Sequence, residues 1–160
     1  MRQDFKTGLL AALSFVTVFA AAGIGNLATM PSIPTWYAAL NKPFFNPPNW
    51  IFGPVWTLLF SLLVFSFWRI LKAPKSNPHR PAAIAAFAAQ MVLNPLWSIV
   101  FFYLHAPLPA LFIVVLLELS VLAMIRNFSR VDSLAGRIQW PYAAWVAFAT
   151  LLNCAIVLLN

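Results

Sequence analysis

Charged residues are scarce in this chain. Only 8% of its 160 residues are charged, against about a quarter in an ordinary soluble domain. Hydrophobic residues make up 62%. A water-soluble fold of this size covers its surface largely with polar and charged side chains, which this composition cannot supply. The scarcity of charge therefore excludes a soluble globular domain and indicates a protein whose solvent is the lipid bilayer.

Cysteine, carboxylates and histidine are too few for several kinds of active site. Cys154 is the single cysteine, so neither an intramolecular disulfide nor a cysteine-based metal cluster can form. Asp4, Glu118 and Asp132 are too scattered to act as acid–base partners. The two histidines fall in predicted loops without the spacing of metal ligands. We therefore predict no metal site and no cofactor.

Long apolar runs dominate what is present. Five of them approach the roughly 20 residues that a membrane-spanning helix requires. They cover residues 8–28, 50–71, 81–104, 107–125 and 139–159. We predict one all-α membrane domain over residues 1–160, a bundle of five transmembrane helices. Glu118 is the only ionisable residue well inside one of these runs. It is either a functional carboxylate or a protonated group that is hydrogen-bonded to a neighbouring helix.

The basic residues gather on one side of such a bundle. All except Lys42 lie in the amino-terminal segment, the second loop or the fourth loop, at Arg2, Lys6, Arg69, Lys72, Lys75, Arg80, Arg126, Arg130 and Arg137. Helical membrane proteins carry this excess on the cytoplasmic side. The pattern predicts an internal amino terminus in a bacterial cell membrane. Anionic lipid headgroups are the expected partner of these charges, and nucleic acid is not.

Alanines in the third predicted helix form small-residue surfaces. Ala82 and Ala86 lie four residues apart, as do Ala85 and Ala89. Such pairs let two helix backbones approach closely. They either pack within the chain or form the contact of a homodimer, and the sequence leaves both open.

The first loop, residues 29–49, is longer than most connections and rich in aromatic residues and proline. Loops of this length are usually functional or disordered, and the aromatic content argues against disorder. Between Trp36 and Trp56 the chain has three tryptophans and several prolines. Proline fixes φ and removes a backbone donor, so we expect a stiff segment. We predict that it acts as a lid over an apolar ligand.

Aromatic side chains share helix faces in three of the runs, and two of these faces also carry amides. The spacing places these on common faces: Trp56, Phe60, Leu63 and Phe67; Gln90, Asn94, Trp97 and Phe101; Tyr142, Trp145, Ala149 and Asn153. Amides inside a membrane face the bundle interior, so the rings beside them face inward too. An apolar wall with a few amides is typical of a small-molecule site. Plain helix packing remains the alternative, and an interfacial aromatic belt fits Trp50, Trp68 and Trp140.

Three segments resemble the TspO or translocator protein family, which includes the tryptophan-rich sensory proteins and the peripheral-type benzodiazepine receptor. They read WYAALNKPFFNPPNWIFGPVW, QMVLNPLWSIVFF and PYAAWVAFATLLN, in order across nearly the whole chain. The resemblance implies a five-helix receptor or sensory protein that binds porphyrins such as protoporphyrin IX beneath the first loop. By motif position, the wall of that pocket comprises Tyr37, Pro47, Trp56, Phe60, Asn94, Trp97, Trp145 and Ala149.

The resemblance leaves the activity open. It also implies a transporter of tetrapyrroles or sterols, or an enzyme that degrades porphyrin in light with Trp56 and Trp145. Family members are often dimeric, which implies a homodimer here, with the third helix as one candidate contact. Some members reside in outer membranes, including the mitochondrial outer membrane. Phe45 replaces a tryptophan that the family commonly carries. Residues 153–160 lack the tyrosine and basic residue of the animal sterol motif, which argues against sterol binding there.

Overall fold

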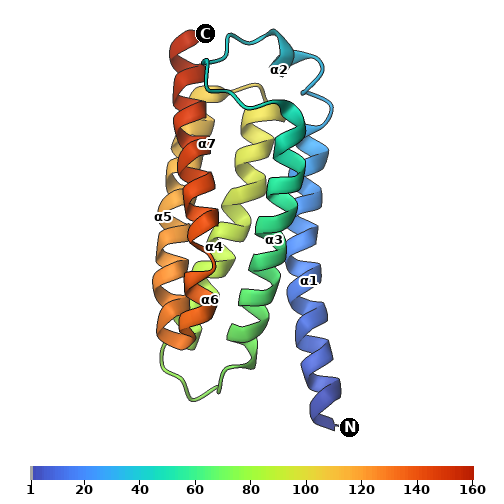
Figure 1. Ribbon diagram of the computed structural model, residues 1–160, viewed down its shortest axis with the longest axis vertical. Coiled ribbons are helices and arrows are strands. Elements are labelled where there is room, and N and C mark those ends of the chain that lie inside the picture. Colours follow the sequence, from blue (N-terminus) through green and yellow to red (C-terminus); the bar gives the residue numbers. More distant parts are fainter. Residues whose placement is uncertain (1) are drawn as a thin grey trace.

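The computed structural model describes the backbone of residues 2–160 and the side chains of residues 5–160. Within these residues the chain is helical and has no β-strand (Figure 1). Its elements follow in the order α1 (Arg2–Thr29), α2 (Trp36–Ala39), α3 (Asn49–Lys72), α4 (Arg80–Ser98), the π-helical turn η1 (Ile99–Tyr103), α5 (Pro107–Val131), α6 (Ser133–Arg137) and α7 (Trp140–Leu159). The prediction of an all-α membrane protein with a five-helix bundle is confirmed.

Five segments of the described chain are long and apolar enough to cross a membrane: α1, α3, α4 with η1, α5, and α6 with α7. Two helices are longer than their apolar runs predict. α5 extends to Val131 instead of residue 125, and α1 begins at Arg2 instead of residue 8. A charged residue ends an apolar run without ending a helix, because lysine and arginine are good helix formers. Arg126 and Arg130 therefore lie on α5.

The long helices form a ring. α1 packs against α3 and α4, α4 packs against α5, and α5 packs against α7. At the point where α1 meets α4, a Cβ added to Gly25 would lie 3.3 Å from Ser98 Oγ, so the missing side chain permits the close approach. α3 and α7 complete the ring through aromatic side chains. The rings of Phe52 and Trp145 are 5.8 Å apart, centroid to centroid.

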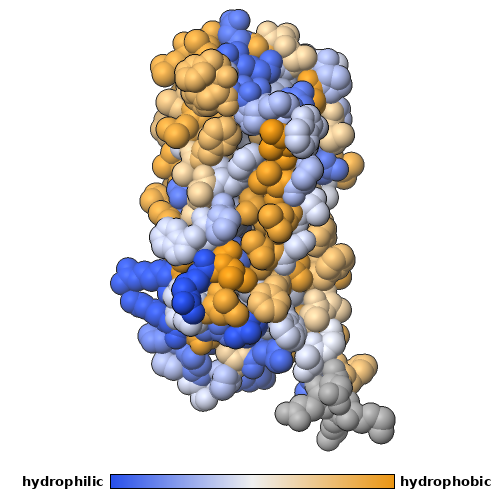
Figure 2. Space-filling model, in the orientation of Figure 1, coloured by the Kyte–Doolittle hydropathy of each residue, from blue (hydrophilic) through white to orange (hydrophobic). Residues whose placement is uncertain are grey.

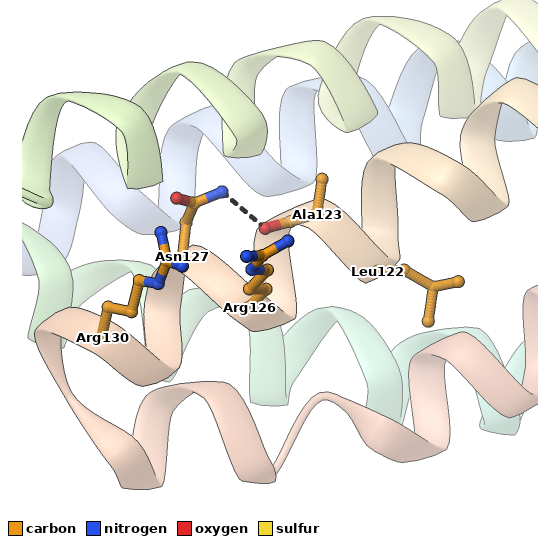
Figure 3. Close-up of a pocket in the computed structure, with 5 residues that line it drawn as sticks. All are labelled: Leu122, Ala123, Arg126, Asn127 and Arg130. Carbon is orange, nitrogen blue, oxygen red and sulfur yellow. Dashed lines mark hydrogen bonds between the residues drawn. The ribbon is translucent and has the colours of Figure 1, made fainter.

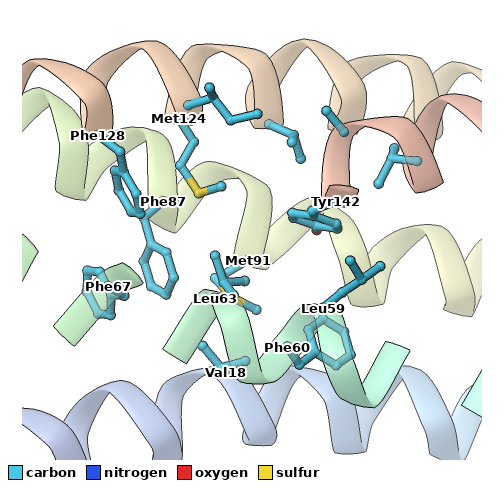
Figure 4. Close-up of a cluster of buried hydrophobic side chains, with 14 of the residues drawn as sticks. Val18, Leu59, Phe60, Leu63, Phe67, Phe87, Met91, Met124, Phe128 and Tyr142 are labelled. Carbon is cyan, nitrogen blue, oxygen red and sulfur yellow. The ribbon is translucent and has the colours of Figure 1, made fainter. Parts of the chain in front are cut away.

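The core lies where these helices meet (Figure 4). Phe67 of α3 and Phe87 of α4 stack with their ring centroids 3.6 Å apart. Leu63, Met124 and Phe128 around them have no exposed surface. Lipid tails are as apolar as these side chains, so the helices associate through close packing rather than a hydrophobic driving force. The predicted inward orientation of Gln90, Asn94 and Asn153 is confirmed, since all three are buried.

The two ends of the bundle differ in composition. At one end, called here the capped end, residues 30–48 with the short helix α2 lie across the bundle beside the carboxyl terminus (Figure 1). The other end, called the basic end, holds the α3–α4 and α5–α6 connections. Figure 2 shows hydrophilic residues at that end and a broad apolar surface above it. The proposed ligand site belongs to the half of the molecule that the loop covers.

Candidate functional site

Tyr142 of α7 joins three of the predicted site residues in the middle of the bundle. Its hydroxyl donates to Gln90 Oε1 at 2.9 Å and accepts from Asn94 Nδ2 at 3.1 Å. The indole of Trp56 meets the Tyr142 ring edge to face at 6.1 Å and stacks on Phe60 at 5.1 Å. We call Trp56, Phe60, Asn94 and Tyr142 the inner group. Phe60, Asn94 and Tyr142 are buried, whereas Trp56 is only partly buried.

A second group lies between the inner group and the loop. Tyr37 of α2 packs against Phe101 and Phe102, with ring centroids 6.3 and 5.5 Å away, and Trp97 packs against the same two phenylalanines at 5.7 and 5.9 Å. The indole nitrogen of Trp97 donates to Asn153 Oδ1 at 3.1 Å. We call Tyr37, Trp97, Phe101 and Phe102 the outer group. It connects the loop to the helices.

The π-helical turn at the end of α4 positions this outer group. Pro95 lacks the N–H that a regular helix requires, and the chain leaves α-helical geometry after Ser98. The amide of Leu104 then donates to the carbonyl of Ile99, five residues back, at 2.9 Å. π-Turns of this kind occur often at functional sites. Here the turn carries Phe101 and Phe102, which the loop contacts.

Trp145 of α7 lies on the side of the site that faces α3. Its ring contacts Phe52 of α3 at 5.8 Å and Phe148 of its own helix at 5.5 Å. Phe148 in turn meets Phe45 of the loop at 6.3 Å. Phe45 of the loop therefore rests on α7. Ala149, one turn beyond Trp145, is buried.

The loop is fastened at both of its sides. Trp36 stacks on His105 of the α4–α5 connection with ring centroids 4.5 Å apart. Ser32 Oγ in the same region donates to the carbonyl of Phe102. At the other side, the amide of Asn41 donates to Asn160 Oδ1 at 3.0 Å, and Asn160 Nδ2 donates back to the Asn41 carbonyl at 3.1 Å. These contacts hold residues 32–41 against the bundle.

Tyr37 and Lys42 order the loop itself. The Tyr37 hydroxyl donates to Asn46 Oδ1 at 2.8 Å, and Asn46 Nδ2 donates to the carbonyl of Pro47 at 3.1 Å. Burial raises the pKa of Tyr37 to about 12. Lys42 Nζ donates to the carbonyls of Ala38 and Leu40 and lies 5.0 Å from the centre of the Tyr37 ring. Lys42 is thus bound within the loop.

Two hollows on the molecule lie outside this aromatic wall. A groove of about 770 Å³ runs between α1, α3 and α4, past Thr17, Phe67 and Met91, and none of the eight predicted site residues lines it. A second hollow, of about 460 Å³, lies on α5. The rings of the inner and outer groups rest on one another.

Several residues that the sequence singled out lie apart from the wall. Trp50 is 74% exposed at the start of α3, as interfacial residues are. Trp140 is 56% exposed at the start of α7, but the last span begins at Ser133, so Trp140 lies inside that span and not at its end as predicted. Trp68 lies under Lys72, whose Nζ is 4.3 Å from the ring centre. Glu118 Oε2 is buried and has no hydrogen-bond partner among the described residues. The described residues also contain no group of three or more histidine, cysteine or acidic side chains that could hold a metal ion.

Asp132 has a structural contact that its isolated position in the sequence did not reveal. Its Oδ2 lies 2.7 Å from Arg69 Nη2, and its Oδ1 accepts from the amides of Leu134 and Ala135 at the start of α6. Burial alone would raise the pKa of this carboxyl, but the hydrogen bonds and the charge of Arg69 bring it below its usual range. The carboxylate therefore ties the end of α3 to α6.

The fold and this wall define a multi-pass α-helical membrane protein with aromatic side chains packed beneath its first loop. The chain belongs to the TspO/MBR family, whose model matches residues 12–159. Over 147 aligned residues it is 41% identical to the tryptophan-rich protein TspO of Archaeoglobus fulgidus. The aligned region covers 92% of this chain and 94% of that protein.

Two other relatives carry functional names. The tryptophan-rich sensory protein of Cereibacter sphaeroides is 35% identical over 147 residues, covering 91% of this chain and 90% of the relative. The human translocator protein is 32% identical over 122 residues, covering 76% of this chain and 72% of the relative. The resemblance seen in the three sequence motifs is confirmed.

Proposed function

We propose that this protein is a membrane receptor or sensory protein that binds protoporphyrin IX or a similar flat apolar ligand beneath its first loop. The relatives support the broader statement, a sensory or translocator role in a membrane. The aromatic wall between α3, α4 and α7 supports the narrower statement, that the protein binds a flat apolar ligand. Indole and phenyl faces stack on flat ring systems, and Trp56 and Trp145 are only partly buried by the chain's own residues.

Titration with protoporphyrin IX tests this proposal. The purified protein in detergent is titrated in the dark while tryptophan fluorescence and porphyrin absorbance are followed. Binding in the wall predicts saturable quenching and weaker affinity in Trp56→Phe and Trp145→Phe, by roughly 5–12-fold if each indole contributes about 1–1.5 kcal/mol through its ring contacts. Trp50→Phe and Trp140→Phe remove exposed tryptophans at helix ends and serve as matched controls. Equal losses in all four variants would reject this site.

A light-dependent enzyme is the second candidate, because the electron-rich indoles of Trp56 and Trp145 would lie against the macrocycle. The same titration under illumination separates the two functions. Loss of porphyrin absorbance that stops in Trp56→Phe or Trp145→Phe, with binding retained, would establish catalysis. If the absorbance of the bound porphyrin stays constant under illumination, the result would support a receptor and not an enzyme. A transporter must in addition move porphyrin across the membrane of proteoliposomes, and a flux assay measures this directly.

We also propose that the basic end faces the cell interior of a bacterial membrane. The excess of lysine and arginine at that end supports this orientation. Single cysteines in a Cys154→Ala background provide the test, at Ser76 in the α3–α4 connection and at Phe44, which is fully exposed in the loop. An impermeant maleimide on intact cells should label Phe44→Cys and spare Ser76→Cys. The reverse pattern would overturn the orientation.

A homodimer through α4 is the remaining proposal from the sequence. Ala82, Ala85 and Ala89 are exposed, so these three do not pack within the chain, whereas Ala86 is partly buried against the core. A second copy could bring its backbone close to this stripe. Oxidation of an Ala89→Cys, Cys154→Ala variant in membranes should give a disulfide-linked dimer. Phe112→Cys in the same background, on the exposed face of α5, is the control.

A further inference from the structure

The hollow on α5 is lined by apolar residues on one side and by polar ones on the other. Its volume is about 460 Å³, and its lining residues are Leu122, Ala123, Arg126, Asn127 and Arg130. Figure 3 shows them together on one face of α5, with the Arg126 and Arg130 side chains beside Asn127 and with Leu122 further along the helix. Asn127 Nδ2 donates to the carbonyl of Ala123 at 2.8 Å, which holds that amide along the helix.

The two arginines of this hollow differ from the other arginines whose side chains the structure describes. Arg69 pairs with Asp132, Arg80 donates to the carbonyls of Ile70 and Leu71, and Arg137 donates to the carbonyl of Ser133. In the described part of the chain, no hydrogen bond or ion pair joins the side chain of Arg126 or Arg130 to another residue. Their five N–H donors each are free to bind a planar or tetrahedral anion.

The order of residues along α5 matches the order of groups in a phospholipid. Leu122 and Arg130 are eight residues apart, which is about 12 Å along a helix axis. Leu122 lies toward the membrane interior and is exposed, and Arg130 is in the last turn of the helix at the basic end. Acyl chains occupy the level of Leu122 and phosphates the level of the helix end.

We propose that Arg126, Arg130 and Asn127 form a binding site for the phosphate headgroup of an anionic phospholipid. The two guanidinium groups bind the phosphate oxygens, and the first part of one acyl chain lies along Ala123 and Leu122. This site is separate from the aromatic wall and does not depend on which ligand the wall binds. It differs from the general attraction of basic residues to an anionic membrane, because two specific arginines and one hollow carry it.

Lipid binding by a charge-matched pair of variants tests the proposal. The full-length protein is reconstituted into vesicles of phosphatidylcholine with a small fraction of phosphatidylglycerol, and lipid bound after gentle extraction is counted by native mass spectrometry. Arg126→Gln with Arg130→Gln should weaken phosphatidylglycerol binding by about fivefold for each arginine. Lys72→Gln with Lys75→Gln removes the same charge from the same end and should change binding less than twofold if the proposal is right.

A lysine variant, a competition with inorganic phosphate and a comparison of the two double variants make the outcome decisive. Arg126→Lys with Arg130→Lys keeps the charge but loses the forked donors, so it should recover only part of the binding. Inorganic phosphate at millimolar concentration should fail to displace the lipid, and displacement would instead indicate a free-anion site. Equal losses in the arginine and lysine double variants would mean that only net charge acts, which overturns the proposal. Circular dichroism verifies that all variants retain their helices.

Discussion

The capped end and the basic end of this bundle are held by different kinds of contact. At the capped end, segments far apart in the sequence meet through paired rings and amides, such as Trp36 with His105 and Asn41 with Asn160. At the basic end, arginines contact carbonyls or Asp132, or have no described partner. The difference suggests that the capped end is built to enclose a ligand and the basic end to meet a lipid headgroup layer.

The largest effect is expected from the polar contacts around Tyr142 in the middle of the bundle, between the two ends. Tyr142→Phe removes the hydrogen bonds to Gln90 and Asn94 and leaves both amides buried without them. We expect a loss of about 1–3 kcal/mol in the free energy of unfolding, measured in detergent by circular dichroism. Tyr103→Phe alters a 68% exposed tyrosine and is the matched control. Equal stability of the two variants would show that this network does not hold the helices together.

The second-largest effect on stability is expected at Asp132 of the basic end. Asp132→Ala removes both the ion pair with Arg69 and the cap of α6, at a cost of roughly 1–2 kcal/mol. Asp132→Asn keeps a capping oxygen and should cost about half as much.

The pH dependence of this contact has a definite sign. The pKa of Asp132 is lower in the folded protein than its usual value. Its stabilisation is therefore present above the usual carboxyl range and is lost as the pH falls through the lowered pKa. The stability difference between the unmodified chain and Asp132→Asn should shrink on acidification. A difference that grows instead would contradict the assigned ion pair.

The smallest effect on stability is expected at the fastening of the loop. Asn160→Ala removes its hydrogen bonds to Asn41, which lie at the surface, so the global free energy of unfolding should fall by about 1 kcal/mol or less. Amide hydrogen exchange in residues 32–42 should nevertheless become faster, because the segment opens locally. Ser61→Ala, on the exposed face of α3, is the control. Unchanged exchange in the loop would mean that the Asn41–Asn160 pair does not fasten it.

The bundle follows from local properties of the sequence, whereas the site does not follow in full. Apolar runs of sufficient length predict the spanning helices, and the amides Gln90, Asn94 and Asn153 correctly orient two of them, α4 and α7. Helical spacing also placed Tyr142 beside Trp145. It could not show that Tyr142 joins Gln90 to Asn94, because that contact depends on the rotation of α7 against α4.

The loop shows the same limit more strongly. Its prolines and aromatics indicate a stiff segment, but its contacts with His105 and Asn160 join residues about 70 and 119 positions apart. Such pairs carry no signal in a single sequence. The hollow on α5 was missed for another reason: the apolar run stops at residue 125, so Arg126 and Arg130 read as loop residues, although α5 continues to Val131.

Locking the loop tests most directly the central claim that it acts as a lid over the aromatic site. Asn41→Cys with Asn160→Cys, in a Cys154→Ala background, places two thiols where the loop meets the carboxyl terminus. Oxidation should slow the dark binding of protoporphyrin IX by about tenfold or more, because the lid can no longer move, and reduction should restore the rate. The Asn41→Cys variant alone controls for the substitution. Equal binding rates in the oxidised and reduced protein would contradict the account.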